Sequence, residues 1–222
     1  MLSEIVKGVL KMSIRLLDLA PERRDAILNA ALKEFVLRGF DNASTNVIAK
    51  EAGISKALMF HYVNNKQELF LFVCDYFTGL LNNEYFMKMD FTEGDLFKRL
   101  RQSYLLQMEL LEQYPWIFEF SKLSTVTKSE EVNKELENRA NKKQASCDRQ
   151  IFDRVDISKF RKDLDIEKCK QFILWTNIGF TNQIVSTMRN AQASNIDYER
   201  ILLTLDEYLE ELKKLFYVTS TE

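Results

Sequence analysis

The stretch that most limits how this chain can fold is residues 44–70, STNVIAKEAGISKALMFHYVNNKQELF. It predicts three short helical segments joined by one glycine and two polar breaks. Residues 45–51 have an apolar face over barely two turns, and Gly53 supplies the left-handed backbone position that a tight turn between helices needs. Ser55 then caps a second short helix. Because helices this short are unstable alone in water, the pair is expected to cross as a helix-turn-helix, whose second helix enters the DNA major groove.

The composition favours an all-helical protein with one large domain or two small ones. The 222 residues include only 6 Gly and 2 Pro, and 46% of them are hydrophobic. No apolar run approaches the roughly 18 residues of a membrane-spanning helix, so no span is expected. The three cysteines, Cys74, Cys147 and Cys169, lack metal-ligand spacing and are expected to be ordinary thiols in a reducing cytoplasm. We expect no metal and no cofactor.

The net charge of −2 is unevenly distributed along the chain. Residues 1–70 contain 10 Lys and Arg against 8 Asp and Glu, a balance of +2, so the remainder carries −4. This asymmetry is mild, but a dimer that binds a short operator needs only a local basic rim.

Residues 1–20 form an N-terminal extension with an amphipathic helical pattern. Its apolar positions are spaced by three and four residues, and Lys7, Lys11 and Arg15 lie off this stripe. A secretory signal is not expected, because the lysines interrupt any apolar region. Three interpretations stay open: a helix docked on the body, a loose tail ahead of a true start at Met12, and a helix on a membrane surface.

Further helix signals follow along the chain. Pro21 suits a first helical turn, and the helix after it is expected to end at Gly39. Asn65 and Glu68 form a capping box at the start of a long helix. The remaining expected helices cover 96–111, a short segment from Pro115 to Phe120, one charged helix over 129–155, and two final helices, 165–192 and 197–217, capped by Asp165 and Asp197.

Residues 24–70 combine these features with several motifs in register. A first helix ends in Gly-aromatic and is followed by Thr, Ile-Ala, Ala-Gly-Ile-Ser-Lys, an aromatic cluster and Lys-x-Glu-Leu. This series resembles the tetracycline-repressor-like (TetR) family of regulators, whereas residues 71–222 match it only in length and helical layout. The resemblance implies a three-helix DNA-binding domain over 21–70 and a helical effector-binding and dimerisation domain over 71–222.

The candidate DNA contacts divide into two groups. Thr45 and Lys66 begin helices, where free N–H groups and a cation suit a phosphate oxygen. In the family, equivalents of these two residues and of an aromatic at Phe60, His61 or Tyr62 hold the DNA backbone. The base readers would be at the start of the second short helix, at Ser55, Lys56, Ala57 and Leu58, where Lys56 suits guanine acceptors. Ala57 and Phe60 stand where the family commonly has glycine and tyrosine.

The second half is rich in aromatic residues, which are also typical of an ordinary core. The resemblance implies an effector site there, and methionine with aromatics suits an adaptable apolar cavity. The candidate ligand-binding residues are Tyr104, Met108, Trp116, Phe120 and Trp175. We expect the effector to be a hydrophobic or aromatic small molecule.

Two stripes in the last helices predict a dimer interface. Gly179 in mid-helix indicates close approach of a second helix, with Phe172, Thr176 and Gln183 on the same face. Leu205 and Leu209 belong to a second stripe, and two helices from each protomer would form a four-helix bundle. The alternative is that both stripes are buried within one chain.

The sequence therefore predicts a cytoplasmic, homodimeric transcription regulator, a repressor rather than an activator, that leaves its double-stranded DNA operator when a small hydrophobic effector binds. An adaptor or DNA-binding dimer without an effector would be favoured by the absence of a cavity. A helical enzyme would need a catalytic constellation. The chain has one histidine, no zinc-type His-Glu-x-x-His run and no phosphate-binding glycine loop, so we expect no enzyme.

Overall fold

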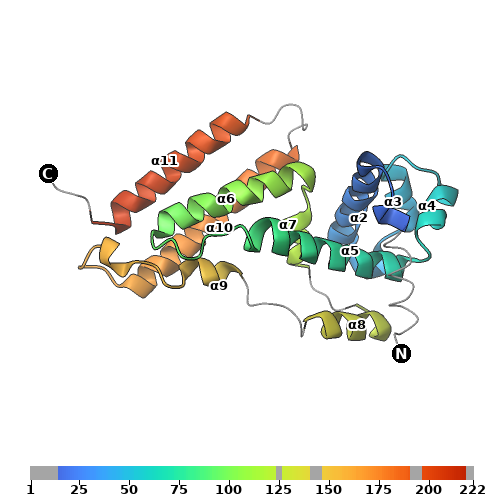
Figure 1. The fold of residues 1–222 in the computed structure, drawn as a ribbon, viewed down its shortest axis with the longest axis horizontal. Helices are drawn as coiled ribbons and strands as arrows, with labels where there is room; N and C mark the ends of the chain where they lie inside the picture. Colours follow the sequence, from blue (N-terminus) through green and yellow to red (C-terminus); the bar gives the residue numbers. More distant parts are fainter. Residues whose placement is uncertain (1–14, 124–126, 141–146, 191–196, 219–222) are drawn as a thin grey trace. The chain divides into compact units, whose positions relative to one another are not determined.

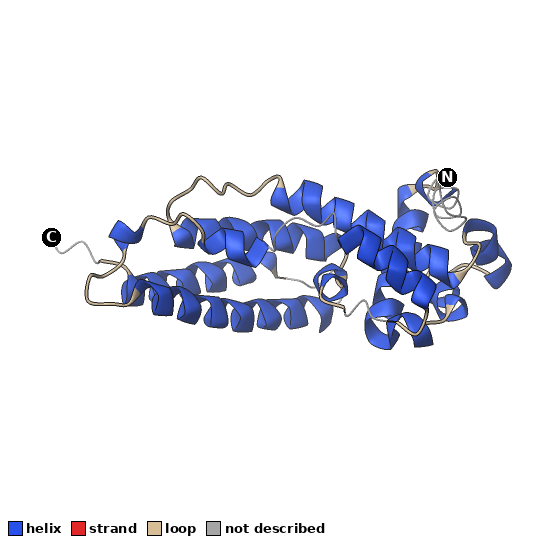
Figure 2. Cartoon of the chain, turned by 90° about the horizontal axis from the view of Figure 1, so that it is seen from below, coloured by secondary structure: helices blue, strands red, loops and turns tan. Residues whose placement is uncertain are grey.

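The computed structural model describes residues 15–123, 127–140, 147–190 and 197–218. These residues form helices joined by loops, which confirms the all-α prediction (Figure 2). Within the described ranges, β pairing is limited to one isolated antiparallel bridge between Phe160 and Tyr217. None of the described helices combines the length and the hydropathy that a membrane crossing requires.

The chain divides into two compact units, and the first is discontinuous in sequence. It comprises the chain up to Asn82 together with residues 113–144. Its helices, labelled in Figure 1, are α2 (Pro21–Asn42), α3 (Thr45–Glu51), α4 (Lys56–Tyr62), α5 (Lys66–Leu81), α7 (Ile117–Ser121) and α8 (Glu130–Ala140). The expected domain boundary between residues 70 and 71 falls inside α5.

The second unit comprises residues 83–112 and 145–222. Its elements are a π-helical turn η1 (Asn82–Phe86), α6 (Leu96–Gln113), α9 (Cys147–Phe152), a 3₁₀ turn η2 (Ile157–Lys159), α10 (Ile166–Asn190) and α11 (Tyr198–Phe216). The prediction of one helix over 129–155 is wrong, because α8 and α9 belong to different units and α9 ends at Phe152, before Arg154 with φ 54°.

The core of the first unit forms around the inner face of α2. Ile27, Leu28, Leu32 and Phe35 on this face are fully buried. Rings from α5 and α7 extend this core, with edge-to-face pairs of Phe35 with Phe70 at 4.9 Å and of Phe70 with Phe120 at 6.1 Å between centroids. Such pairs stabilise a core beyond simple burial of area.

The N-terminal extension is described only from Arg15 onward, so the predictions for residues 1–14 lie outside the described residues. Leu16 is fully buried. The Arg15 guanidinium donates to the His61 carbonyl at 3.0 Å, near the end of α4. This part of the extension therefore packs on the first unit.

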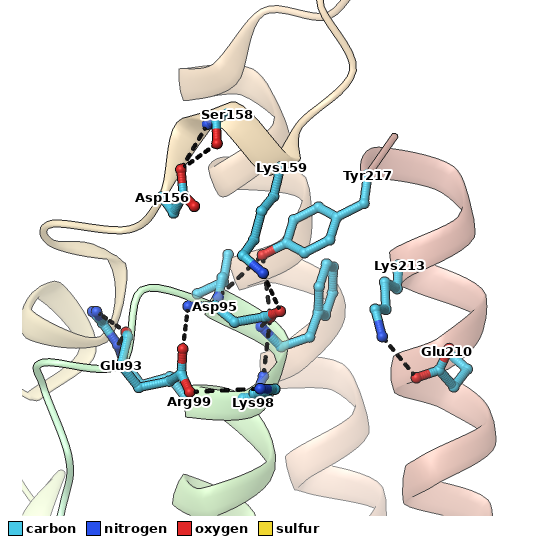
Figure 3. Close-up of polar contacts among 12 residues, drawn as sticks. Glu93, Asp95, Lys98, Arg99, Asp156, Ser158, Lys159, Glu210, Lys213 and Tyr217 are labelled. Atoms are coloured by element: carbon cyan, nitrogen blue, oxygen red, sulfur yellow. Dashed lines mark hydrogen bonds and ion pairs between the residues drawn. The ribbon is translucent and has the colours of Figure 1, made fainter. Parts of the chain in front are cut away.

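A buried polar cluster around Asp95 holds together segments of the second unit that are distant in sequence. Figure 3 shows Lys159 and Tyr217 pointing toward its carboxylate, at 3.2 Å from Lys159 Nζ and 3.3 Å from the Tyr217 hydroxyl. Burial opposes ionisation of Asp95, but hydrogen bonds from Lys159 and from the Lys98 backbone N–H outweigh it and lower the pKa. The fully buried Arg99 donates to the carbonyls of residues 93, 151 and 153. The cluster joins α6, the segment after α9 and the end of α11.

Candidate nucleic-acid interface

The turn between α3 and α4 is a complete Schellman motif. Gly53 has φ +66°, as the sequence predicts. The Ile54 N–H donates to the Ala49 carbonyl at 3.0 Å, and the Gly53 N–H donates to the Lys50 carbonyl at 3.1 Å. These two bonds satisfy carbonyls that the end of α3 would leave free. The crossing of α3 and α4 is therefore set by local backbone chemistry.

Helix α4 is capped as the sequence predicts, and two buried residues anchor it. Ser55 Oγ accepts the Leu58 N–H at 3.1 Å. Met59 and Val63 are 0% and 1% exposed, and they attach one side of α4 to the core. Because seven residues cannot remain helical alone, these two anchors and the cap hold the helix in place.

The opposite side of α4 is open to solvent. Ser55, Lys56, Ala57 and His61 are exposed, and Leu58 and Tyr62 are half-buried. Phe60 is 46% exposed, and the Lys56 ammonium lies 5.9 Å from the centroid of its ring. Both side chains are therefore accessible to a partner on this side of α4. The predicted base readers and backbone contacts of α4 thus share one accessible face.

Lys66 at the start of α5 has a defined position. Asn65 caps this helix by accepting the Glu68 N–H at 2.8 Å, and the Glu68 carboxylate accepts from the Asn65 amide at 3.0 Å. The Lys66 ammonium donates to the Asp41 carbonyl at 2.9 Å and lies 4.8 Å from the centroid of the Phe40 ring. Two of its three N–H donors remain for another oxygen.

Thr45 is the half-buried first residue of α3. The residue before it, Ser44, makes no side-chain capping bond; instead, its backbone N–H donates to the buried Glu34 carboxylate at 3.0 Å. The sequence did not indicate this role for Glu34. It also missed Arg15, whose bond to the His61 carbonyl connects two segments that are 46 residues apart.

The predicted effector residues are divided between the two units. Phe120, 9% exposed, and the half-buried Trp116 belong to the first. In the second, Tyr104 and Met108 are buried, and the Tyr104 hydroxyl donates to the Asn177 carbonyl at 3.1 Å. Burial raises the pKa of Tyr104 well above its usual value. Trp175 was expected to line an apolar cavity, and its side chain is 59% exposed in the protomer.

The predicted dimer residues separate into an exposed set and a buried set. On α10, Phe172 is 51% exposed, and Thr176, Gly179 and Gln183 are exposed. On α11, Leu205 and Leu209 are 0% and 4% exposed, so almost no surface of either remains for a partner. The single-chain alternative therefore holds for the α11 stripe, because this face of α11 packs inside the protomer.

Comparison with known proteins places the helix-turn-helix in a family. The family profile described as bacterial regulatory proteins, tetR family, matches residues 27–73, which cover α3, α4 and most of α2. Residues 27–73 are therefore similar to the N-terminal, DNA-binding part of tetR-family regulators. The regulator BetI of Agrobacterium fabrum (strain C58 / ATCC 33970) is 42% identical over 55 residues, which are 25% of this chain and 27% of BetI.

A second relative is YerO of Bacillus subtilis (strain 168), described as an uncharacterized HTH-type transcriptional regulator. It is 32% identical over 75 residues, 34% of this chain and 25% of YerO. The matches thus span about a quarter of these two relatives. The structure of the ketosteroid transcriptional regulator KstR2 of Mycobacterium tuberculosis superimposes with a TM-score of 0.58 at 18% identity, covering 90% of this chain and 98% of KstR2. At this identity the likeness shows the fold, and it extends over both units.

Among the described residues, no group of three or more His, Cys, Asp or Glu side chains could hold a metal ion. The buried Asp95 cluster has its groups paired with one another, with Lys159 on the carboxylate and carbonyls on Arg99.

Proposed function

We propose that this protein is a transcription regulator that holds double-stranded DNA with α4 in the major groove and Lys66 at a phosphate. The observation that carries the proposal is the two-sided character of α4. Met59 and Val63 fix the helix, while Lys56 and Phe60 on its other side are exposed. In this arrangement Lys56 donates to guanine acceptors, and Ala57 can contact a thymine methyl group.

We propose further that the regulator works as a homodimer in the cytoplasm. The outer face of α10 supports this, because Phe172, Trp175 and Ile178 are 51%, 59% and 47% exposed. The rings of Phe172 and Trp175 pack edge to face with centroids 5.9 Å apart. A second copy of the chain would cover this apolar face and present a second α4 to a half-site about 34 to 36 Å away.

A small hydrophobic effector would release the DNA, which makes a repressor the favoured form. The buried Tyr104 and Met108 offer an interior suited to such a molecule. KstR2 is named as a ketosteroid regulator, which is consistent with an apolar effector for this fold. The effector would act by favouring protomer positions in which the spacing of the two α4 helices no longer matches the half-sites.

Selection of bound fragments from genomic DNA with the purified protein tests the DNA-binding proposal. With the selected duplex, Lys66→Gln should weaken binding to specific and random sequences alike and reduce the salt slope by about 1. Lys56→Ala should instead change base preference, by about 1 to 3 kcal/mol at one position. If both variants bind as the parent does, these contacts are wrong; a parent that selects no sequence contradicts the proposed function.

The effector is tested by screening apolar and steroid-like compounds for protection against thermal unfolding, since a ligand that binds the folded state raises the melting temperature. A true effector and the operator must weaken each other's binding by the same factor. Compounds that bind tightly and leave operator affinity unchanged would remove the effector role.

A further inference from the structure

We propose that residues 127–140, here called the strap, position Lys66 for its contact with DNA. The strap consists of α8 and the three residues before it, all within the first unit. The inference deepens the proposed function and rests on it, because the position of Lys66 matters only if the protein holds DNA.

The strap reaches Lys66 through a single residue, Asp41. The Asp41 backbone carbonyl accepts from Lys66 Nζ at 2.9 Å. Its side-chain carboxylate accepts the backbone N–H of Lys128 with both oxygens, each at 3.2 Å. Asp41 follows the kink at Gly39 near the end of α2, where helical carbonyls lack internal partners. The same residue therefore connects the start of the strap to the ammonium of Lys66.

The start of the strap is rigidly joined to α8. The Thr127 N–H donates to Asn133 Oδ1 at 2.8 Å, and the Asn133 amide donates back to the Thr127 carbonyl at 2.8 Å. Ser129 Oγ accepts the Val132 N–H at 3.3 Å. Because these bonds close residues 127–133 into one capped turn, the Lys128 N–H moves together with α8.

The other end of the strap is held on α5. Val132 and Leu136 are 0% and 7% exposed, and α8 packs on α5. The Arg139 guanidinium binds the Asp75 carboxylate with two bonds, at 2.8 and 3.1 Å. It also donates to the Glu135 carboxylate at 2.9 Å. Bidentate pairs of this kind fix orientation as well as distance. The strap thus bridges Asp75 on α5 and Asp41 on α2.

The strap orients Lys66 for its contact with a DNA phosphate. Lys66 begins α5, and the strap fixes both α5, at Asp75, and the carbonyl that orients the Lys66 ammonium. When the strap is released, Lys66 keeps its charge but loses its fixed direction, so a phosphate contact costs more side-chain entropy.

The test compares operator affinity across salt concentrations for variants at both ends of the strap. Arg139→Gln and Asp41→Ala should each weaken binding on the order of 3- to 10-fold, as expected for loss of one well-formed ionic or charged hydrogen-bonding contact. Lys134→Gln is the matched control, because it removes one positive charge from an exposed position of the same helix and should bind as the parent does. Circular dichroism checks that all variants stay folded.

A double-variant cycle separates positioning from general loss of stability. In a Lys66→Gln background, adding Arg139→Gln should weaken binding by no more than about twofold, because the side chain that the strap positions is already gone. The proposal is overturned if the losses of operator affinity from Lys66→Gln and Arg139→Gln are fully additive. It is also overturned if Arg139→Gln and Asp41→Ala bind the operator as the parent does while Lys66→Gln binds it more weakly. Neither result contradicts DNA binding itself, because a failure of DNA binding would already be seen with the parent protein.

Discussion

Replacing Trp175 with serine should weaken self-association of the protein. A tryptophan can bury up to about 250 Å², and Trp175 is 59% exposed in the protomer, so roughly 150 Å² is open to a partner. At about 25 cal/mol per Å², covering this area stabilises the dimer by roughly 3.8 kcal/mol per protomer and roughly 7.5 kcal/mol in total. This is an upper value, because a partner covers only part of the area and serine still fills some of it.

Because the contact is partial, we expect the dimer dissociation constant to rise about 100-fold in Trp175→Ser, which corresponds to about 2.8 kcal/mol. Sedimentation velocity over a concentration series measures the change. Leu37→Ser is the control, because Leu37 on α2 is 57% exposed but lies in the first unit, and its loss should leave the association unchanged. An unchanged constant in Trp175→Ser would show that the outer face of α10 is not the interface, and a monomeric parent at micromolar concentration would contradict the dimer itself.

Three shorter predictions concern α10, the turn and the buried cluster. Gly179→Leu should prevent dimerisation and tight operator binding while the protomer keeps its helical circular dichroism signal, because a Cβ at Gly179 meets no atom within 4 Å in the protomer; loss of the helical signal would show that the protomer itself needs the glycine. Gly53→Ala should cost about 1 to 2 kcal/mol, through the positive φ and not through a clash, and calorimetry measures it. Because the pKa of Asp95 is lowered in the folded state, its ionised carboxylate stabilises the fold at pH values above its ordinary pKa of 3.8, and this stabilisation is lost as the pH falls through the lower folded-state pKa. Asp95→Asn should therefore flatten the acid limb of a curve of stability against pH, and an unaltered limb would refute this reasoning.

The local features of the fold were predictable because their causes lie within a few residues. Ser55, Asn65 and Asp197 accept the backbone N–H groups three positions ahead, as capping patterns predict. The positive φ of Gly53 likewise follows from the need to reverse the chain between two short helices.

Features that depend on which helix face meets which neighbour were not predictable. Trp175 and Leu205 both lie in apolar helical stripes, yet one is 59% exposed and the other fully buried. Periodicity locates a face but does not name the element that covers it. The bonds of Asp41 connect positions 25 and 87 residues apart, and each uses a backbone group that carries no residue signature.

The discontinuity of the first unit limits how this protein can be divided or recombined. A fragment that ends at Asn82 would retain α2 to α5 but would lose Phe120 and Tyr114, whose rings pack against Phe70 and Phe77. The cut would expose the rings of Phe70 and Phe77 to water. It would also remove the hydrogen bond of 3.0 Å that the Tyr114 hydroxyl donates to Asp25. A chimera that exchanges DNA specificity therefore has to carry residues 113–140 along with the N-terminal helices, and evolution by simple exchange of an N-terminal module faces the same restriction.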